Sequence, residues 1–291
     1  MARVTKRGKT GAEAGVDQDM TCAFVFSGGG SLAASQVGTL RALLEAGIRP
    51  DMVVGTSAGA LNAVHFATHP HPAGVDELEA SWRSIRTGQV APLSPWSLLT
   101  GVAGQGDGLV DQRAFRAYLA RACDVERLEQ TALPVHVVAT DLASGQPRVL
   151  SSGDAVTALL ASTALPGIFA PVLHEGDQLV DGGVAANTPV LQAEQLGADS
   201  IWVLPALGPP TSRTPVHGAV AVALQALTDV LARASSNDVA AAHGTVRVLP
   251  APDSRARHPL DFRYSSDLIT DAYALAWDWL VEHGYGPVAA A

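Results

Sequence analysis

Two segments of this sequence run from a short apolar stretch into glycine and then into a helical pattern. They are FVFSGGGSLAAS at residues 24–35 and VVGTSAGALNAV at residues 53–64. Glycine is needed where the backbone turns sharply, or where it approaches a neighbour so closely that a Cβ atom would collide. Both segments therefore predict a strand that ends in a tight turn and is followed by a helix.

Further short apolar runs along the chain predict the rest of a sheet. Each is apolar on both faces, which is typical of strands covered by helices on both sides. The residues Val37, Leu40, Leu43 and Leu44 have the spacing of one helix face, and Gly47 is the expected end of that helix. We therefore expect an α/β fold, with helices on both faces of a mainly parallel central sheet. The predicted strands span residues 23–26, 52–54, 135–139, 201–204 and 246–249.

Three further helices are predicted from the residues at their start. Asp111 and Asp154 precede helical patterns and suit the N-cap position. Thr188 is also expected to cap a helix, because the following Pro189 suits a first helical position. The least regular segment, residues 86–110, is interpreted either as a lid over an apolar pocket or as a covered surface loop.

The composition limits the compartment and the partners. With 291 residues that are 47% hydrophobic, we expect one domain over residues 21–291 behind a disordered tail at 1–20. The net charge of −9 argues against a nucleic-acid partner. Cys22 and Cys123 are too few for a disulfide framework, so we expect free core thiols and a cytoplasmic protein. No apolar run is long enough to span a bilayer, although basic residues in the tail would allow transient contact with an anionic membrane surface.

The segment GTSAG at residues 55–59 has the pattern of a nucleophile elbow. In that turn a serine stands between a strand and a helix, and Gly55 and Gly59 leave room for the neighbouring backbone. The helix that begins beside Ser57 points free N–H groups and its positive dipole end toward the hydroxyl. Ser57 is therefore the candidate nucleophile, and the alternative is an unreactive serine in a tight turn.

Gly28, Gly29 and Gly30 follow the preceding strand and suit an oxyanion hole. Without side chains, their N–H groups can face the negative charge that develops when a serine attacks a carbonyl. The same segment, with Ala33, also fits the dinucleotide-binding pattern G-x-G-x-x-A. That alternative is weaker because Asp51, the acidic residue it needs, opens a strand instead of closing one.

The base that would activate Ser57 is not singled out by the residues around it. A serine triad on an α/β-hydrolase fold would use a late histidine, but the elbow comes too early in this chain to suit that fold. The segment QLVDGGVAANTP at residues 178–189, taken alone, indicates only an Asp-Gly turn. The histidine candidates are His217, His243, His258 and His283.

Taken together and in this order, the glycine and serine segments resemble the patatin-like phospholipases, a family of serine acyl hydrolases with a Ser-Asp dyad. The resemblance extends from about residue 22 to about residue 284. It implies that Ser57 is the nucleophile, that Asp181 is the general base and that the backbone of Gly28 to Gly30 forms the oxyanion hole. It also implies that neither a metal nor a cofactor is needed. The segments that carry it are SGGG at 27–30, GTSAG at 55–59, ATDLASG at 139–145, ASTALPGIFAPV at 161–172 and DGGVAANTPV at 181–190. The residues with implied supporting roles are Gly55, Gly59, Gly182, Gly183 and Asn187.

One departure from the family pattern follows the three glycines. Family members commonly have a small residue, then Arg or Lys, then Gly, whereas this chain has Ser31, Leu32 and Ala33. Because backbone N–H groups hold the oxyanion, we expect activity to be retained, with neutral or small acyl esters favoured over anionic head groups.

The expected function is hydrolysis of carboxylic ester bonds of lipids through an acyl-enzyme. An aspartate serves as base near neutral pH only if its pKa is raised, so we expect Asp181 to be buried. The alternatives are a catalytically impaired lipid-binding protein, a Ser-His-Asp esterase and a dinucleotide-binding module.

Overall fold

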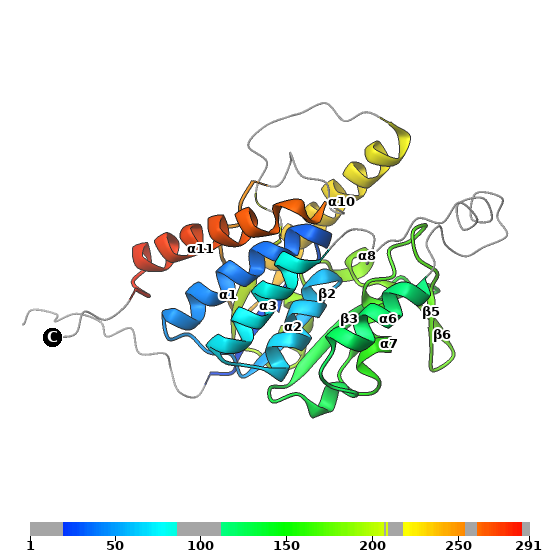
Figure 1. Ribbon diagram of the computed structural model, residues 1–291, viewed down its shortest axis with the longest axis horizontal. Coiled ribbons are helices and arrows are strands. Elements are labelled where there is room, and N and C mark those ends of the chain that lie inside the picture. The colour runs from blue at the N-terminus through cyan, green and yellow to red at the C-terminus, as the bar shows by residue number, and fades with distance from the viewer. Residues whose placement is uncertain (1–19, 86–111, 207, 209–217, 254–260, 287–291) are drawn as a thin grey trace, which may run out of the picture.

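The computed structural model describes residues 20–85, 112–206, 208, 218–253 and 261–286 (Figure 1). Residues 1–19 of the predicted tail, the irregular segment at 86–110 and the predicted cap Asp111 lie outside these ranges. No helix in the described ranges combines the length and the apolar character needed to cross a bilayer.

The described residues form one mixed sheet of eight strands. The strand order is β5-β6-β3-β2-β1-β7-β8, and β4 pairs with β3. The run from β3 to β8 is parallel, whereas β4, β5 and β6 are antiparallel to their neighbours. The strands are β1 (Cys22–Phe26), β2 (Met52–Thr56), β3 (Val135–Asp141), β4 (Pro147–Leu150), β5 (Val172–His174), β6 (Asp177–Asp181), β7 (Ser200–Leu204) and β8 (Thr245–Val248).

The five strands predicted from apolar runs are the five parallel strands, so the expectation of a mainly parallel central sheet is confirmed. The antiparallel strands were not predicted. β5 has three residues, and Leu173 at its centre is 70% exposed. A strand this short and this exposed has no apolar run that would indicate it.

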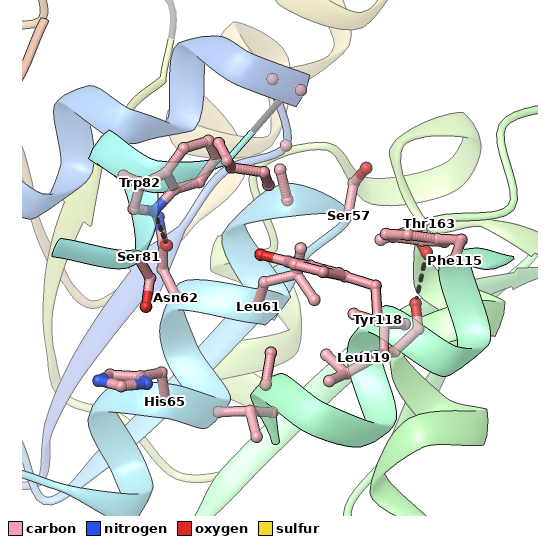
Figure 2. Close-up of a pocket in the computed structure, with 18 of the residues that line it drawn as sticks. Ser57, Leu61, Asn62, His65, Ser81, Trp82, Phe115, Tyr118, Leu119 and Thr163 are labelled. Carbon is pink, nitrogen blue, oxygen red and sulfur yellow. Dashed lines mark hydrogen bonds between the residues drawn. The ribbon is translucent and has the colours of Figure 1, made fainter. Parts of the chain in front are cut away.

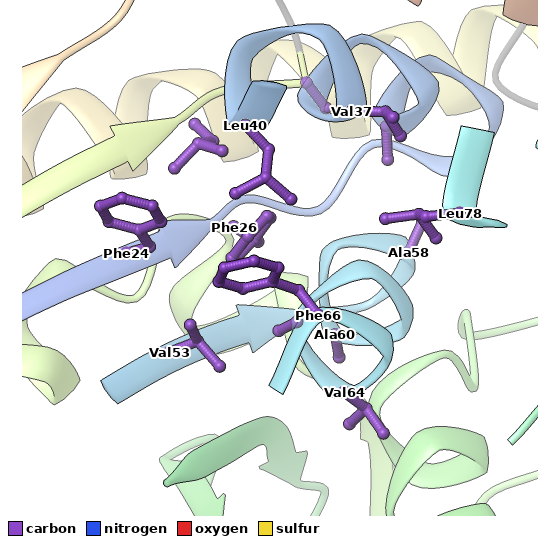
Figure 3. Packing of buried hydrophobic residues seen from close by; sticks show 14 of the residues in the cluster. Phe24, Phe26, Val37, Leu40, Val53, Ala58, Ala60, Val64, Phe66 and Leu78 are labelled. Atoms are coloured by element: carbon purple, nitrogen blue, oxygen red, sulfur yellow. The ribbon is translucent and has the colours of Figure 1, made fainter. Parts of the chain in front are cut away.

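Alternate residues of the strands face two different layers of helices. Phe24 and Phe26 of β1 belong to the larger core cluster, which includes side chains of α1, α2, α3 and α11. Ala23 and Val25 belong to a smaller cluster with side chains of α8 and α9. Figure 3 shows the larger cluster, in which the rings of Phe24 and Phe66 stack with centroids 6.4 Å apart. Helices therefore cover both faces of the sheet, as expected from strands that are apolar on both faces.

The helices begin and end largely as their capping residues predict. Gly47, with φ of 80°, follows α1, and its N–H donates to the carbonyl of Leu44. The Asp154 carboxylate accepts the N–H of Thr157 at 2.7 Å and caps α7. The helices are α1 (Ser35–Glu45), α2 (Ala58–Thr68), α3 (Pro72–Ser84), α6 (Gln112–Ala122), α7 (Ala155–Ser162), α8 (Gly183–Ala186), α9 (Val190–Gln195), α10 (Ala219–Ala241) and α11 (Ser265–Glu282), with 3-10 turns at Gly30–Ala34, Leu128–Gln130 and Phe262–Tyr264.

The prediction that Thr188 caps a helix is wrong. α9 begins at Val190, and Pro189 occupies its N-cap position without a side-chain hydrogen bond. The Thr188 hydroxyl instead donates to Ser235 of α10 at 3.0 Å. The hydroxyl thus bonds a residue far away in the chain instead of a backbone N–H group at the start of α9. The sequence pattern does not indicate this distant partner.

Candidate active site

Ser57 lies at the turn between β2 and α2. Its backbone has φ of 54° and ψ of −128°, in the left-handed half of φ space that residues with a side chain rarely adopt. Holding a residue there costs about 1–3 kcal/mol, so the surrounding contacts must stabilise the turn. One such contact is the Ser57 N–H, which donates to the Ser162 hydroxyl at 2.8 Å.

The two glycines that flank Ser57 are required by close backbone contacts. A Cβ atom on Gly55 would lie 2.7 Å from the carbonyl oxygen of Gly59. A Cβ atom on Gly59 would lie 2.4 Å from the carbonyl oxygen of Ser27. Both distances are shorter than any non-bonded carbon–oxygen contact in a relaxed structure, so the first helical turn packs on the strand ends only with glycine at these positions.

Asp181 reaches Ser57 from β6, on the other side of β3. The sheet register pairs Asp181 with Ala139 of β3, and Ser57 follows β2 on the opposite edge of β3. The Ser57 hydroxyl donates to Oδ2 of Asp181 at 2.7 Å, and the Gly183 N–H donates to Oδ1 at 2.8 Å. One carboxylate oxygen is thus oriented by backbone, and the other faces the serine hydroxyl.

Burial gives Asp181 the basicity that a proton acceptor needs. The residue is 5% exposed. Desolvation raises its pKa to about 6, against the opposing effect of the hydrogen bonds from Ser57 and Gly183. At neutral pH the carboxylate is therefore mostly ionised and more basic than an exposed aspartate.

The three glycines after β1 differ in what their N–H groups bind. The Gly28 N–H donates to the Asn187 carbonyl at 2.9 Å, so in this conformation it does not face Ser57 as a free donor. The N–H groups of Gly29 and Gly30 have no acceptor within the described part of the chain. Of the three predicted oxyanion-hole donors, Gly29 and Gly30 are therefore the two whose N–H groups remain available to a ligand.

The Asn187 side chain lies between this glycine loop and the turn after Asp181. Its Oδ1 is 2.6 Å from the place a Cβ atom on Gly28 would occupy, and 3.1 Å from that of Gly183. A Cβ atom on Gly182 would lie 2.0 Å from the carbonyl oxygen of Val138. The predicted supporting residues therefore surround the Ser57–Asp181 pair, and bare backbone lets them approach one another.

Leu32, which stands where the family commonly has a cation, is 2% exposed and belongs to the larger core cluster. The glycine loop is thus held at this position by apolar packing instead of by a charged side chain.

Ser162, at the end of α7, is a site residue that sequence reasoning missed. Its buried hydroxyl accepts the Ser57 N–H and donates to the carbonyl of Val138 at 2.6 Å. Its carbonyl accepts the N–H of Gly182, next to Asp181. The segment ASTALPGIFAPV is one of those that carry the family resemblance, but nothing in its residue types indicates which group the serine binds.

An apolar pocket extends from Ser57 and Asp181 along α2 (Figure 2). The α2 residues that face it include Leu61, His65 and Thr68, which share one helix face with Ser57. The pocket volume is about 230 Å³. Its remaining walls come from α3, α6, α7, the segment after α7 and the last 3-10 turn, and include Leu78, Trp82, Phe115, Tyr118, Leu119, Leu159, Phe169 and Phe262.

The histidines suggested for a triad are not beside Ser57 where the structure describes them. His243 pairs with Glu194, and Nδ1 of His283 lies 2.8 Å from the carbonyl of Trp279. His217 and His258 lie outside the described residues. Within those residues, the hydrogen-bond acceptor of the Ser57 hydroxyl is Asp181.

The dinucleotide alternative also lacks its acidic residue. The Asp51 carboxylate accepts the N–H of Cys22 at 2.7 Å, at the amino end of β1. The glycine loop lies at the other end of that strand. Asp51 therefore cannot reach a ribose bound at Gly28 to Gly30.

Both cysteines are free thiols. Cys22 is buried, and desolvation raises its pKa to about 11. Cys123 is partly buried, lines the pocket and also has a raised pKa because of desolvation. A raised thiol pKa lowers the thiolate fraction, so both cysteines are mainly protonated at neutral pH.

An elbow serine whose hydroxyl donates to a buried aspartate, on a mainly parallel sheet, is an arrangement typical of serine acyl hydrolases. Residues 24–194, more than half of the chain, match the family model described as patatin-like phospholipase. The chain belongs to the patatin-like phospholipase family.

Two relatives illustrate the extent of this similarity. The chain is 30% identical over 183 residues to patatin-like phospholipase domain-containing protein 6 of Mus musculus, an alignment that covers 62% of this chain and 13% of the relative. It is 28% identical over 180 residues to lysophospholipase NTE1 of Chaetomium globosum, covering 62% of this chain and 11% of the relative. The chain thus spans only a small part of the length of these relatives. Among solved structures, VipD from Legionella pneumophila is similar with a TM-score of 0.48 and 14% identity, over 91% of this chain and 67% of that one.

Proposed function

We propose that this protein hydrolyses carboxylic ester bonds of lipids with Ser57 as nucleophile and Asp181 as general base. The observation that carries the proposal is the hydrogen bond of 2.7 Å from the Ser57 hydroxyl to Oδ2 of the buried Asp181. A serine hydroxyl is a weak nucleophile unless a neighbouring base removes its proton as it attacks. Among the residues that the structure describes, Asp181 is the base that the Ser57 hydroxyl contacts.

The reaction has two half-steps. Ser57 Oγ adds to the ester carbonyl while its proton passes to Asp181, and the tetrahedral intermediate expels the alcohol, which takes that proton. Water then attacks the acyl-enzyme and loses a proton to Asp181, which returns it to Ser57 Oγ as the fatty acid leaves. General-base catalysis of this kind contributes roughly 10²–10⁴-fold to the rate.

The oxyanion formed in each half-step needs donors beside Ser57. The N–H groups of Gly29 and Gly30 are the candidates, since the Gly28 N–H is occupied by the Asn187 carbonyl in this conformation. Each donor in an oxyanion hole typically contributes about 3 kcal/mol of transition-state stabilisation.

The pocket supports an acyl chain as the bound part of the substrate. Its walls are mainly aliphatic and aromatic, and it opens from the reacting serine. From Ser57 to Thr68, α2 rises roughly 16 Å at 1.5 Å per residue, a length that about a dozen extended methylene groups would span. The names of the relatives, a phospholipase domain protein and a lysophospholipase, agree with a lipid ester.

A cytoplasmic location and transient contact with a lipid surface complete the proposal. Free thiols are typical of a reducing compartment. A lipid ester is reached at a membrane or micelle surface, so the enzyme must contact that surface during turnover.

The test is turnover of p-nitrophenyl butyrate, octanoate and palmitate by the wild type, Ser57→Ala and Asp181→Asn, with chelator present. We expect the wild type to turn over and both variants to lose at least about a thousandfold in kcat. Asp177→Asn is the matched control, because Asp177 lies on the same strand and pairs with Arg148 away from the pocket. An inert wild type that also resists a fluorophosphonate would leave a catalytically impaired lipid-binding protein as the better description.

A further inference from the structure

A chain of buried side-chain hydrogen bonds connects the wall of the pocket to the glycine loop. The Trp82 indole N–H donates to Oδ1 of Asn62 at 2.8 Å, a bond drawn in Figure 2. Nδ2 of Asn62 then donates to Oε1 of Gln36 at 2.8 Å and to the carbonyl of Ala33 at 2.9 Å. Three helices, α3, α2 and α1, contribute one side chain each to this chain.

Gln36 carries the connection to the start of the loop. Its Nε2 donates to the carbonyl of Ser27 at 2.7 Å and to that of Leu204 at 2.9 Å. Ser27 directly precedes Gly28, and Ala33 follows Gly30 by three residues. The network therefore binds the backbone on both sides of the three glycines.

The three side chains are buried, and each of their N–H donors and amide oxygens has a hydrogen-bond partner. Gln36 is 0% exposed, Asn62 1% and Trp82 7%. Both N–H groups of each amide donate, and each amide oxygen accepts one bond. Because a buried group that loses its partner is costly, such a network favours a single arrangement of the backbone it binds.

The other end of the network faces the site where the acyl chain is proposed to bind. Trp82 and Asn62 line the pocket, and the Trp82 ring stacks on Phe262 with centroids 6.1 Å apart. Gln36 does not line it. A change at Gln36 therefore acts on the loop without altering the wall that substrate would touch.

We propose that Gln36, Asn62 and Trp82 are positioning residues that hold the Gly28–Gly30 backbone at the distance from Ser57 that oxyanion binding requires. This inference rests on the proposed hydrolase function of Ser57 for its effect on catalysis. Its structural content, that the network orders the loop, is independent of that function.

The variants that test it are Gln36→Met and Trp82→Phe. Gln36→Met keeps an unbranched side chain of similar length and removes the amide hydrogen bonds. Trp82→Phe keeps an aromatic ring in the wall and removes the indole N–H. With p-nitrophenyl butyrate, whose acyl chain is short, we expect kcat to fall about tenfold with KM unchanged, since a loop displaced by a fraction of an ångström still binds substrate. Affinity for a short-chain trifluoromethyl ketone, which forms an oxyanion on serine, should fall by the same factor.

A second readout does not depend on turnover. Hydrogen–deuterium exchange of the peptide covering residues 24–36 should be faster in both variants than in the wild type, because the loop opens more often. Trp202→Phe is the matched control for loss of a buried indole. Trp202 lies on β7 against Tyr285, away from the pocket, and its variant should keep the wild-type kcat.

The outcomes separate this inference from the proposed function. Unchanged exchange, or unchanged kcat and ketone affinity despite a lower melting temperature, would show that the network serves stability alone and would overturn the inference. A wild type that hydrolyses none of the esters would overturn the hydrolase proposal. Faster exchange in the two variants of such a protein would still support the role of the network in ordering the loop.

Discussion

The hydroxyl of Ser57 and the carboxylate of Asp181 lie 2.7 Å apart, although 124 positions separate the two residues in the chain. They come together because β3 pairs with β2 on one edge and with β6 on the other. β2 ends at Thr56, opposite Val138, and β6 ends at Asp181, opposite Ala139, so the ends of the two strands lie at neighbouring positions along β3. The reactivity of Ser57 and Asp181 depends on this relationship in ways that can be measured.

The pH dependence of hydrolysis should report the pKa of Asp181. Burial raises that pKa to about 6, and only the ionised form accepts the serine proton. We therefore expect kcat/KM to rise about tenfold per pH unit below that value and to level off above it. The measurement is kcat/KM for p-nitrophenyl butyrate from pH 4.5 to about 8. If the fall in kcat/KM at low pH disappears when a histidine is replaced, the result would instead favour a histidine base.

Replacing Asp181 with Asn should stabilise the folded protein at pH 8, although the same change is expected to abolish hydrolysis there. The pKa of this acid is raised from 3.8 to about 6, so the native state binds the proton more tightly than the unfolded state. Stability is therefore lost as the pH rises from 3.8 through about 6, by up to ~3 kcal/mol. We expect Asp181→Asn to melt above the wild type at pH 8, with a much smaller difference near pH 4.

The control for that experiment is Asp177→Asn, at a half-buried position on the same strand, which should change the melting temperature little at either pH. An Asp181→Asn protein that is less stable than the wild type at pH 8 would mean that the hydrogen bonds to the carboxylate outweigh its desolvation.

Removing the Ser162 hydroxyl should slow the reaction through the geometry of the elbow. Ser162→Ala leaves the Ser57 N–H and the Val138 carbonyl without their shared partner. We expect a loss of about 1–3 kcal/mol in the free energy of unfolding and a fall of roughly tenfold or more in kcat with little change in KM.

Ser265→Ala is the matched control for Ser162. It removes another buried hydroxyl, which donates to the carbonyl of Phe262 at 2.9 Å and does not contact the dyad. Equal losses of kcat in the two variants would indicate a general loss of stability instead of a positioning role for Ser162.

Filling the pocket near the serine should shorten the preferred acyl chain. Leu61 faces the pocket one turn of α2 beyond Ser57. In Leu61→Trp we expect kcat/KM for the palmitate ester to fall about 10–100-fold, while the butyrate ester changes by less than about threefold. Leu275→Trp, at an exposed position of α11, should leave both values unchanged. Parallel losses for both esters would place the acyl chain elsewhere.

Much of the fold and part of the site follow from the sequence alone, because they depend on local chemistry. A strand that is apolar on both faces must be covered twice, and GTSAG allows a strained serine where any larger flanking residue would collide with backbone. The five parallel strands, Ser57 and the loop of three glycines are of this kind.

The tertiary structure alone decided which distant groups serve Ser57. The residues around Asp181 indicate only an Asp-Gly turn. The antiparallel pairing of the short strand β6 brings Asp181 to the serine and buries it enough to raise its pKa. Ser162, Gln36 and Asn62 are polar residues whose importance comes from buried partners on other elements. The Gly28 N–H is likewise taken by Asn187, a contact that no local pattern predicts. Hydrogen bonds between residues far apart in the chain produce no periodic pattern of residue types in the sequence. Which groups bond is therefore determined by how the helices and strands pack.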